Sequence, residues 1–133
     1  MYSLARLLFC KLQREISMRH PFSIYAKLEI EKHGECFLTP KRVELLRKIK
    51  TSGSILAASK EMKMSYQQAW SFVKQMNELS PLPLVTRQRG GSHGGGAEVT
   101  RFGVNLIERY EKLEEVHAAY IQKVGEEMLF CFL

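Results

Sequence analysis

The sequence predicts a mainly α-helical fold with small β elements. Three helical patterns follow one another between residues 39 and 79, and a tight turn separates the last two. After them, two short β-forming runs flank a segment in which five of the chain's nine glycines occupy residues 90–96. A last helical pattern carries apolar side chains at heptad-like spacing. Together these features predict a winged helix-turn-helix with an N-terminal β-hairpin, a two-stranded glycine-rich wing and a long C-terminal dimerisation helix.

Residues 1–22 are predicted to form an N-terminal extension that precedes the winged-helix domain at residues 23–133. The apolar patch at Leu7–Phe9 is too short for a secretory signal, and no small-residue cleavage site follows it. Two interpretations stay open. Either translation starts at Met18 rather than at Met1, or the extension contains an amphipathic helix that packs on a partner.

The N-terminal hairpin is predicted from the segments SIYAKLEI (23–30) and ECFLT (35–39), which are rich in β-forming residues and flank His33-Gly34. Three hydroxyl residues then cap three successive helices. Thr39 precedes a proline and begins the first helix, and Ser54 begins a short second one. Ser65, with a glutamine three residues later, forms a capping-box pattern for the third helix, which runs to about residue 79.

The third helix is the predicted recognition helix. Ala69, Val73 and Met76 share one face and are expected to be buried, with Trp70 packed beside them. The opposite face carries amides, hydroxyls and a cation, which are the groups that read base edges and phosphates. Its members are Tyr66, Gln67, Gln68, Ser71, Lys74 and Gln75. An ordinary solvated helix face is the alternative, and the position of this helix in a tight helix pair favours DNA recognition.

The glycine run is predicted to be the tip of a wing between the strands LVTRQR and AEVT. A nucleotide-binding loop needs G-x-x-x-x-G-K-[ST] ahead of a helix, and the sequence has no such motif here. Glycine lets the backbone approach a DNA backbone closely, while Arg87, Arg89 and His93 supply charge. The wing is therefore preferred to a phosphate loop or a small-anion sensor.

A final helix is predicted over residues 100–124, capped by Thr100. Its apolar stripe is too long for a domain of this size to cover, which predicts a homodimer. The proposed dimerisation residues are Leu106, Tyr110, Leu113, Tyr120 and Val124. The alternative is that the stripe packs on the chain's own hairpin, which could hide its first two turns.

Charge and composition favour an anionic partner and disfavour catalysis. The formal net charge is +6, and residues 1–100 hold 16 Lys and Arg against 8 Glu, while residues 101–133 hold 4 against 6. All 14 acidic residues are glutamates, so no aspartate is available for a triad or a phosphoryl-transfer base. Cysteines and histidines lack metal-ligand spacing, and no stretch could span a bilayer. We expect a cytoplasmic protein that is not an enzyme and has no cofactor or metal.

The stretch TSGSILAASKEMKMSYQQAWSFVKQMNELS, followed by LVTRQRGGSHGGGAEVTRFGVNLIERYEKLE, resembles the N-terminal DNA-binding domain of ModE-type, molybdate-responsive regulators, which are related to LysR-type winged helices. The resemblance covers about residues 24–124. It implies a homodimer built by the hairpin and the last helix. It also implies operator contacts from the recognition helix and the wing, at Ser65, Tyr66, Gln67, Gln68, Ser71, Arg87 and Arg89.

Three departures from the family pattern matter. Lys63 stands in the turn where the family usually has glycine, which implies strain unless its φ is negative. Gln67 replaces a basic residue, so the operator sequence can differ. The sequence ends at residue 133, without the C-terminal domains that bind molybdate in the family, so molybdate binding is not expected.

The sequence thus predicts a sequence-specific transcriptional regulator that binds a palindromic site in double-stranded DNA. The main alternative is a winged-helix adaptor that binds proteins and no longer binds DNA. An adaptor has no reason to keep basic residues such as Lys63, Lys74, Arg87 and Arg89 around a polar recognition helix.

Overall fold

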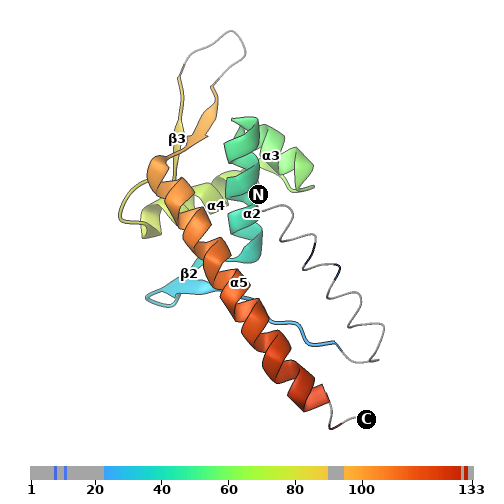
Figure 1. Ribbon diagram of the computed structural model, residues 1–133. Coiled ribbons are helices and arrows are strands. Elements are labelled where there is room, and N and C mark those ends of the chain that lie inside the picture. The colour runs from blue at the N-terminus through green and yellow to red at the C-terminus, as the bar shows by residue number, and fades with distance from the viewer. Residues whose placement is uncertain (1–7, 9–10, 12–22, 90–94, 130, 132–133) are drawn as a thin grey trace. The chain divides into compact units, whose positions relative to one another are not determined.

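The computed structural model describes residues 8, 11, 23–89, 95–129 and 131. The predicted fold class, mainly α with small β elements, is confirmed, and the elements follow the order of a winged helix-turn-helix (Figure 1). The elements are β1 Ile30–Lys32, β2 Glu35–Leu38, α2 Pro40–Ser52, α3 Ile55–Glu61, α4 Tyr66–Leu79, β3 Val85–Arg87, β4 Ala97–Val99 and α5 Arg101–Leu129.

Residues Lys27–Glu114 form one compact unit, and the described residues outside this range belong to a second unit. The first unit contains both strand pairs, helices α2 to α4 and the first half of α5. This unit begins after residue 23 and ends before residue 133, the bounds of the predicted domain.

The N-terminal hairpin forms around His33-Gly34, but its first strand is shorter than predicted. Both turn residues have positive φ, 53° and 81°, as a two-residue hairpin turn of the I′ type requires. Strand β1 begins at Ile30 and not at residue 23. The reason is that β2 ends at Leu38, directly before the N-cap Thr39, so residues N-terminal to Ile30 have no strand to pair with.

All four predicted helix caps are confirmed. In each case a side-chain oxygen accepts a hydrogen bond from the backbone N–H three residues ahead, which satisfies one of the donors left free at a helix start. The capping residues are Thr39, Ser54, Ser65 and Thr100. At the other end of α2, Gly53 adopts a φ of 67° and its N–H donates to the carbonyl of Ile49. This left-handed cap turns the chain directly into α3.

One hydrophobic core lies among α2, α3, α4, the two strand pairs and the start of α5. The predicted inward residues of the recognition helix, Ala69, Val73 and Met76, are fully or almost fully buried there. Arg42 of α2 is buried with them, and its guanidinium donates to the carbonyls of Cys36 and Phe37 and to the side chain of Gln75. These hydrogen bonds satisfy a charge that would otherwise be costly to bury.

Tyr110 belongs to this core, which corrects its predicted place on the dimerisation stripe. Its side chain is only 2% exposed, and its hydroxyl donates to the carbonyl of Leu28 at 2.7 Å. Leu106, one turn earlier, also packs against the core. The first turns of α5 thus cover the chain's own core. The side chain of Tyr110 is long enough to reach the backbone N-terminal to β1.

Alkaline pH is expected to destabilise the unit through Tyr110. Burial, assisted by the negative charge of Glu114, raises the pKa of Tyr110 from 10.0 to about 12. Above pH 10 the unfolded chain loses this proton while the folded chain keeps it, so stability is present below pH 10 and is lost as pH rises toward 12. Between pH 9 and pH 11 this effect should lower the unfolding free energy by about 1.4 kcal/mol. Tyr110→Phe should remove that part of the loss. Urea unfolding at both pH values measures it, and an equal loss in both proteins would contradict the assignment.

Candidate nucleic-acid interface

The exposed face of α4 has the composition predicted for a recognition helix. Ser65, Tyr66, Gln67, Gln68, Ser71 and Lys74 are all exposed, on the side opposite the buried residues. The helix has no acidic residue before Glu78, whose carboxylate lies 3.9 Å from the ammonium of Lys74. Most of this face is therefore able to approach an anionic surface without repulsion from its own carboxylates.

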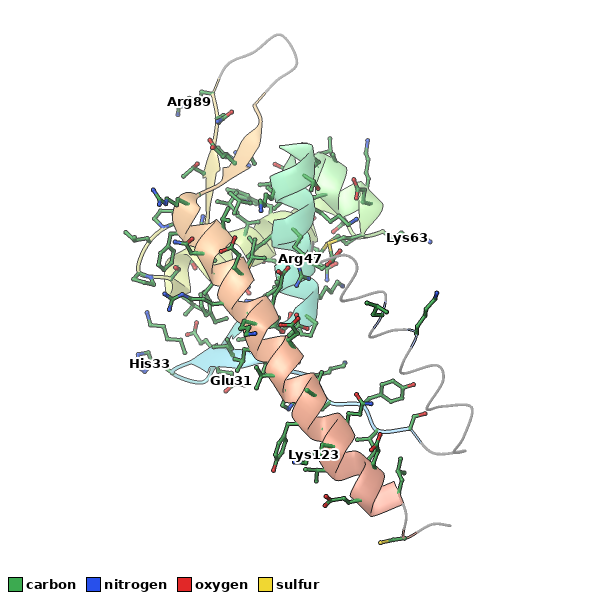
Figure 2. The ribbon with its side chains drawn as sticks, viewed as in Figure 1. Glu31, His33, Arg47, Lys63, Arg89 and Lys123 are labelled. Atoms are coloured by element: carbon green, nitrogen blue, oxygen red, sulfur yellow. The ribbon has the colours of Figure 1, made fainter. Side chains whose placement is uncertain are left out.

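Strands β3 and β4 form an antiparallel ribbon that extends away from the helices of the same unit (Figure 1). Arg89 follows β3 toward the far end of the ribbon and is exposed (Figure 2). Glu98 of β4 is exposed too, and its carboxylate accepts a hydrogen bond from Gln88 at 2.6 Å. His93, the third predicted charged residue of the wing, lies outside the described residues.

The backbone at the root of the ribbon passes close to the end of α2, where a side chain at Gly96 would be crowded. A Cβ on Gly96 would lie 3.1 Å from the carbonyl oxygen of Gly53, and the next residue, Ala97, donates its N–H to that same oxygen at 2.9 Å. The ribbon is thereby attached to the C-terminal cap of α2.

Arg87 joins the wing to the recognition helix. Its Nη2 donates to the hydroxyl of Tyr66 at 3.0 Å, and its Cζ lies 3.9 Å from the centre of the Trp70 ring. Tyr66 and Trp70 are four residues apart and so share one face of α4. The predicted contacts from the two elements therefore form one continuous surface, and Trp70 is part of it as well as half-buried.

A second attachment was not predicted from the sequence. The side chain of Asn77, near the end of α4, accepts hydrogen bonds from the N–H groups of Leu84 and Val85 and donates to the carbonyl of Val85. The corresponding distances are 2.8, 3.2 and 2.9 Å. Asn77 lies in the stretch MNELS, which is part of the resemblance to ModE-type regulators. No role was predicted for it from the sequence.

A contact with α2 also holds the recognition helix in place. Gln75 accepts a hydrogen bond from buried Arg42, and its Nε2 lies 3.4 Å from the hydroxyl of Ser71 on the exposed face. No pattern in the sequence marks Arg42 as buried, since it stands among four other cations on α2, of which Lys41 and Lys50 are exposed.

Lys63 adopts a φ of 53°, so the strain expected from a side chain in place of glycine is present in the turn before α4. Its side chain is exposed at this turn (Figure 2). The turn therefore offers a cation close to the N-terminus of the recognition helix.

Beyond Tyr110, the stripe on α5 is exposed. The exposed fractions are 46% for Leu113, 64% for Tyr120 and 43% for Val124. Val116 is also exposed and was not in the predicted set. Met128 extends the exposed apolar residues further, since α5 continues to Leu129 rather than ending near residue 124.

Arg47 of α2 fixes the first half of α5. Its guanidinium lies 2.6 Å from Glu111, 3.4 Å from Glu114 and 2.9 Å from Glu44 (Figure 2). Burial lowers the pKa of Arg47, but the hydrogen bonds that Arg47 donates to Glu111 and Glu44 outweigh this effect and hold the pKa above its ordinary value. The residue is therefore charged at every relevant pH.

Within the described ranges, no set of three or more His, Cys or Glu side chains is placed to hold a metal ion. Cys36 and Cys131 are exposed free thiols. No described helix combines the length and the hydropathy that a bilayer-spanning segment needs.

No protein-family model matches the chain. Among curated proteins, it is 42% identical over 96 residues to the transcriptional regulator ModE of Haemophilus influenzae, covering 71% of this chain and 38% of that protein. It is 40% identical over 89 residues to the DNA-binding transcriptional dual regulator ModE of Escherichia coli, covering 67% and 34%. This chain is therefore homologous to part of the ModE transcriptional regulators. The resemblance predicted from the sequence is confirmed, and the ModE regulators are a class without enzymatic activity.

The ModE relatives are much longer than the matched region. The chain spans little more than a third of their length, as it does for the molybdenum transport protein ModE of Azotobacter vinelandii, which is 33% identical over 103 residues. Similar solved structures include a MarR family protein from Bacillus stearothermophilus, with 19% identity and a TM-score of 0.48. A ZitR variant from Lactococcus lactis has 13% identity and a TM-score of 0.49. They cover 98% and 96% of this chain, and each is covered to 84%.

Proposed function

We propose that the chain is a sequence-specific transcriptional regulator that binds double-stranded DNA as a homodimer in the bacterial cytoplasm. The DNA-binding surface comprises Ser65, Tyr66, Gln67, Gln68, Ser71, Lys74, Arg87, Arg89 and His93. The observation that carries this proposal is the contact of Arg87 with Tyr66 and Trp70, which unites the wing and α4 into one polar and basic surface.

The groups on this surface divide by chemistry into base readers and backbone contacts. Gln67 and Gln68 can each pair with adenine through two hydrogen bonds in the major groove. Ser65, Ser71 and Lys74 suit phosphates, as does Arg89 at the wing. With no acidic residue on α4 before Glu78, this face fits DNA better than it fits a protein partner of mixed charge.

Dimerisation is proposed to occur through the exposed stripe of α5, from Leu113 to Val124. Large apolar side chains in a row on one long helix usually mark an interface, and Arg47 holds the start of this helix firmly on α2. A two-fold dimer would present two recognition helices roughly 34 Å apart or a multiple of that, and so would select a palindromic operator.

Molybdate sensing is not part of the proposal. The pocket of about 280 Å³ beside α4 is lined by Glu35 and Glu78 as well as by Arg42. The Arg42 guanidinium is already committed to two carbonyls and to Gln75, and two carboxylates would repel an oxyanion. The chemistry of this pocket therefore does not suit molybdate.

DNA affinity is expected to depend strongly on salt. If about four to six phosphates are neutralised per dimer, log K should fall against log salt with a slope of about −0.9 for each contact. Fluorescence anisotropy with a labelled duplex between low and physiological ionic strength measures the slope. A flat profile would reject DNA binding and favour the protein-binding adaptor.

Gln68→Ala and Arg89→Ala should differ in kind. Gln68 reads a base in this proposal, so its loss should relax specificity at one operator position by about 1–3 kcal/mol. Arg89 holds the DNA backbone, so its loss should weaken binding to every sequence alike. Competition binding against a randomised site library separates the two effects. If both variants weakened specific and random DNA equally, the roles would be wrongly assigned.

A further inference from the structure

We propose that Arg87 acts on DNA through Tyr66: it positions the Tyr66 hydroxyl as a hydrogen-bond donor toward DNA and does not itself neutralise a phosphate. The inference rests on the proposed DNA-binding function. It makes Arg87 a positioning residue, Tyr66 the residue that contacts DNA, and Trp70 the platform on which Arg87 is held.

The geometry of Arg87 favours retention on the protein. Its guanidinium is held at two points, by the 3.0 Å hydrogen bond to Tyr66 and by the contact 3.9 Å from the centre of the Trp70 ring. A cation over an indole ring is attracted by the ring's π electrons, and indole is the strongest partner of this kind. If the guanidinium moved outward to a phosphate it would lose both interactions, which favours its retention over the Trp70 ring.

The backbone that carries Arg87 is fixed as well. Asn77 binds the N–H and the carbonyl of Val85, two residues before Arg87, and Thr86 pairs with Glu98 across the ribbon. The wing strand therefore delivers the guanidinium to the same place on α4 in the free protein. Positioning of this kind lowers the entropy that DNA binding must remove.

The donors and acceptors of the two side chains then determine the role of Tyr66. A tyrosine hydroxyl has one proton to donate and two lone pairs that accept, whereas a guanidinium only donates. Arg87 therefore occupies a lone pair of the Tyr66 oxygen, and since the hydroxyl has no acceptor among the described residues, its proton remains for an acceptor on DNA. On duplex DNA such acceptors are the N7 and O6 of guanine, the N7 of adenine, the O4 of thymine and the phosphate oxygens.

Arg89 provides the matched control. It is the next arginine along the wing, two residues beyond the end of β3, is exposed, and makes no hydrogen bond or ion pair within the described part of the chain. Arg87→Gln and Arg89→Gln remove the same charge from positions two residues apart, so any difference between them reflects the stack and the bond to Tyr66.

The first test needs no DNA. Trp70 is the only tryptophan, so its fluorescence reports the stack directly. Arg87→Gln uncovers one face of the ring and should increase quenching by acrylamide, while Arg89→Gln should leave it unchanged. Equal quenching in all three proteins would show that the stack does not exist in solution and would overturn the proposal.

The second test uses a duplex selected by the wild-type protein from a randomised library. Arg89→Gln should reduce the salt slope by about 1.8, because each dimer loses two phosphate contacts, while Arg87→Gln should leave the slope unchanged and still weaken binding. Tyr66→Phe should weaken binding about threefold to tenfold in the wild-type background and less than twofold in Arg87→Gln.

The outcomes separate the two proposals. If the wild-type protein binds no duplex, the proposed function and this inference both fail. If it binds, and Arg87→Gln flattens the salt slope as much as Arg89→Gln does, or Tyr66→Phe costs the same in both backgrounds, the inference alone fails.

Discussion

Replacing Leu113 with glutamate is expected to convert the dimer into a monomer and to lower the affinity for a palindromic site on the order of 100-fold or more, because two linked half-site contacts become one. Leu113 is 46% exposed in the single chain, so the substitution costs the isolated fold little. In the proposed interface the same carboxylate would be buried without a partner. Analytical ultracentrifugation and operator binding measure the two effects, and circular dichroism should show that the helices persist.

Leu82→Glu is the control for this experiment. Leu82 is 55% exposed and lies in the segment between α4 and β3, outside α5. The same change of residue there should leave the dimer intact. A Leu113→Glu protein that stays dimeric with unchanged operator affinity would show that the interface lies elsewhere.

Gly103→Ala is expected to cost about 1–3 kcal/mol of unfolding free energy, the largest effect on stability that we expect from adding one methyl group. A Cβ at this position would lie 2.5 Å from the backbone carbonyl oxygen of Leu84 and 2.8 Å from a methyl of Val99. The carbonyl of Leu84 cannot retreat, because it accepts the N–H of Thr100 and so closes the ribbon onto α5. Urea unfolding at neutral pH measures the change.

Gly125→Ala in the same helix is the matched comparison. Among the described residues, the nearest atoms that a Cβ would meet there belong to the side chain of Ile24, the closest being its terminal methyl at 2.9 Å, which can rotate away. Alanine also favours a helix interior over glycine by up to about 1 kcal/mol. This variant should be neutral or more stable, and a loss as large as that of Gly103→Ala would refute the steric explanation.

Local features of the fold were predictable from the sequence because they depend on neighbours in the chain. The caps at Thr39, Ser54, Ser65 and Thr100 need only a hydroxyl and a nearby N–H, and all four form. The buried and exposed faces of α4 follow from helical periodicity in the same way. The predicted length of the strand before His33 was wrong, because that strand can extend only as far as its partner β2.

Features that depend on distant contacts were not predictable. Helical spacing places Tyr110 on the same stripe as Leu113, and it cannot tell whether the chain itself or a second copy covers a given turn. Burial of Arg42 and the contact of Arg87 with Trp70 join residues from separate elements, and nothing in the order of residues indicates them. The site residues from α4 were found in sequence, but the support beneath them was not.

The hydrogen bonds of Asn77 have a consequence for the behaviour of the wing in a crowded cell. A ribbon of only two strands leaves the outer backbone groups of each strand open to pairing with a strand of another molecule, which is a common route to aggregation. At the start of β3 those groups belong to Val85, and the amide of Asn77 binds both of them as a neighbouring strand would. A single side chain therefore closes the start of the ribbon to strand addition. This lowers the tendency of the wing to pair with a strand of another molecule.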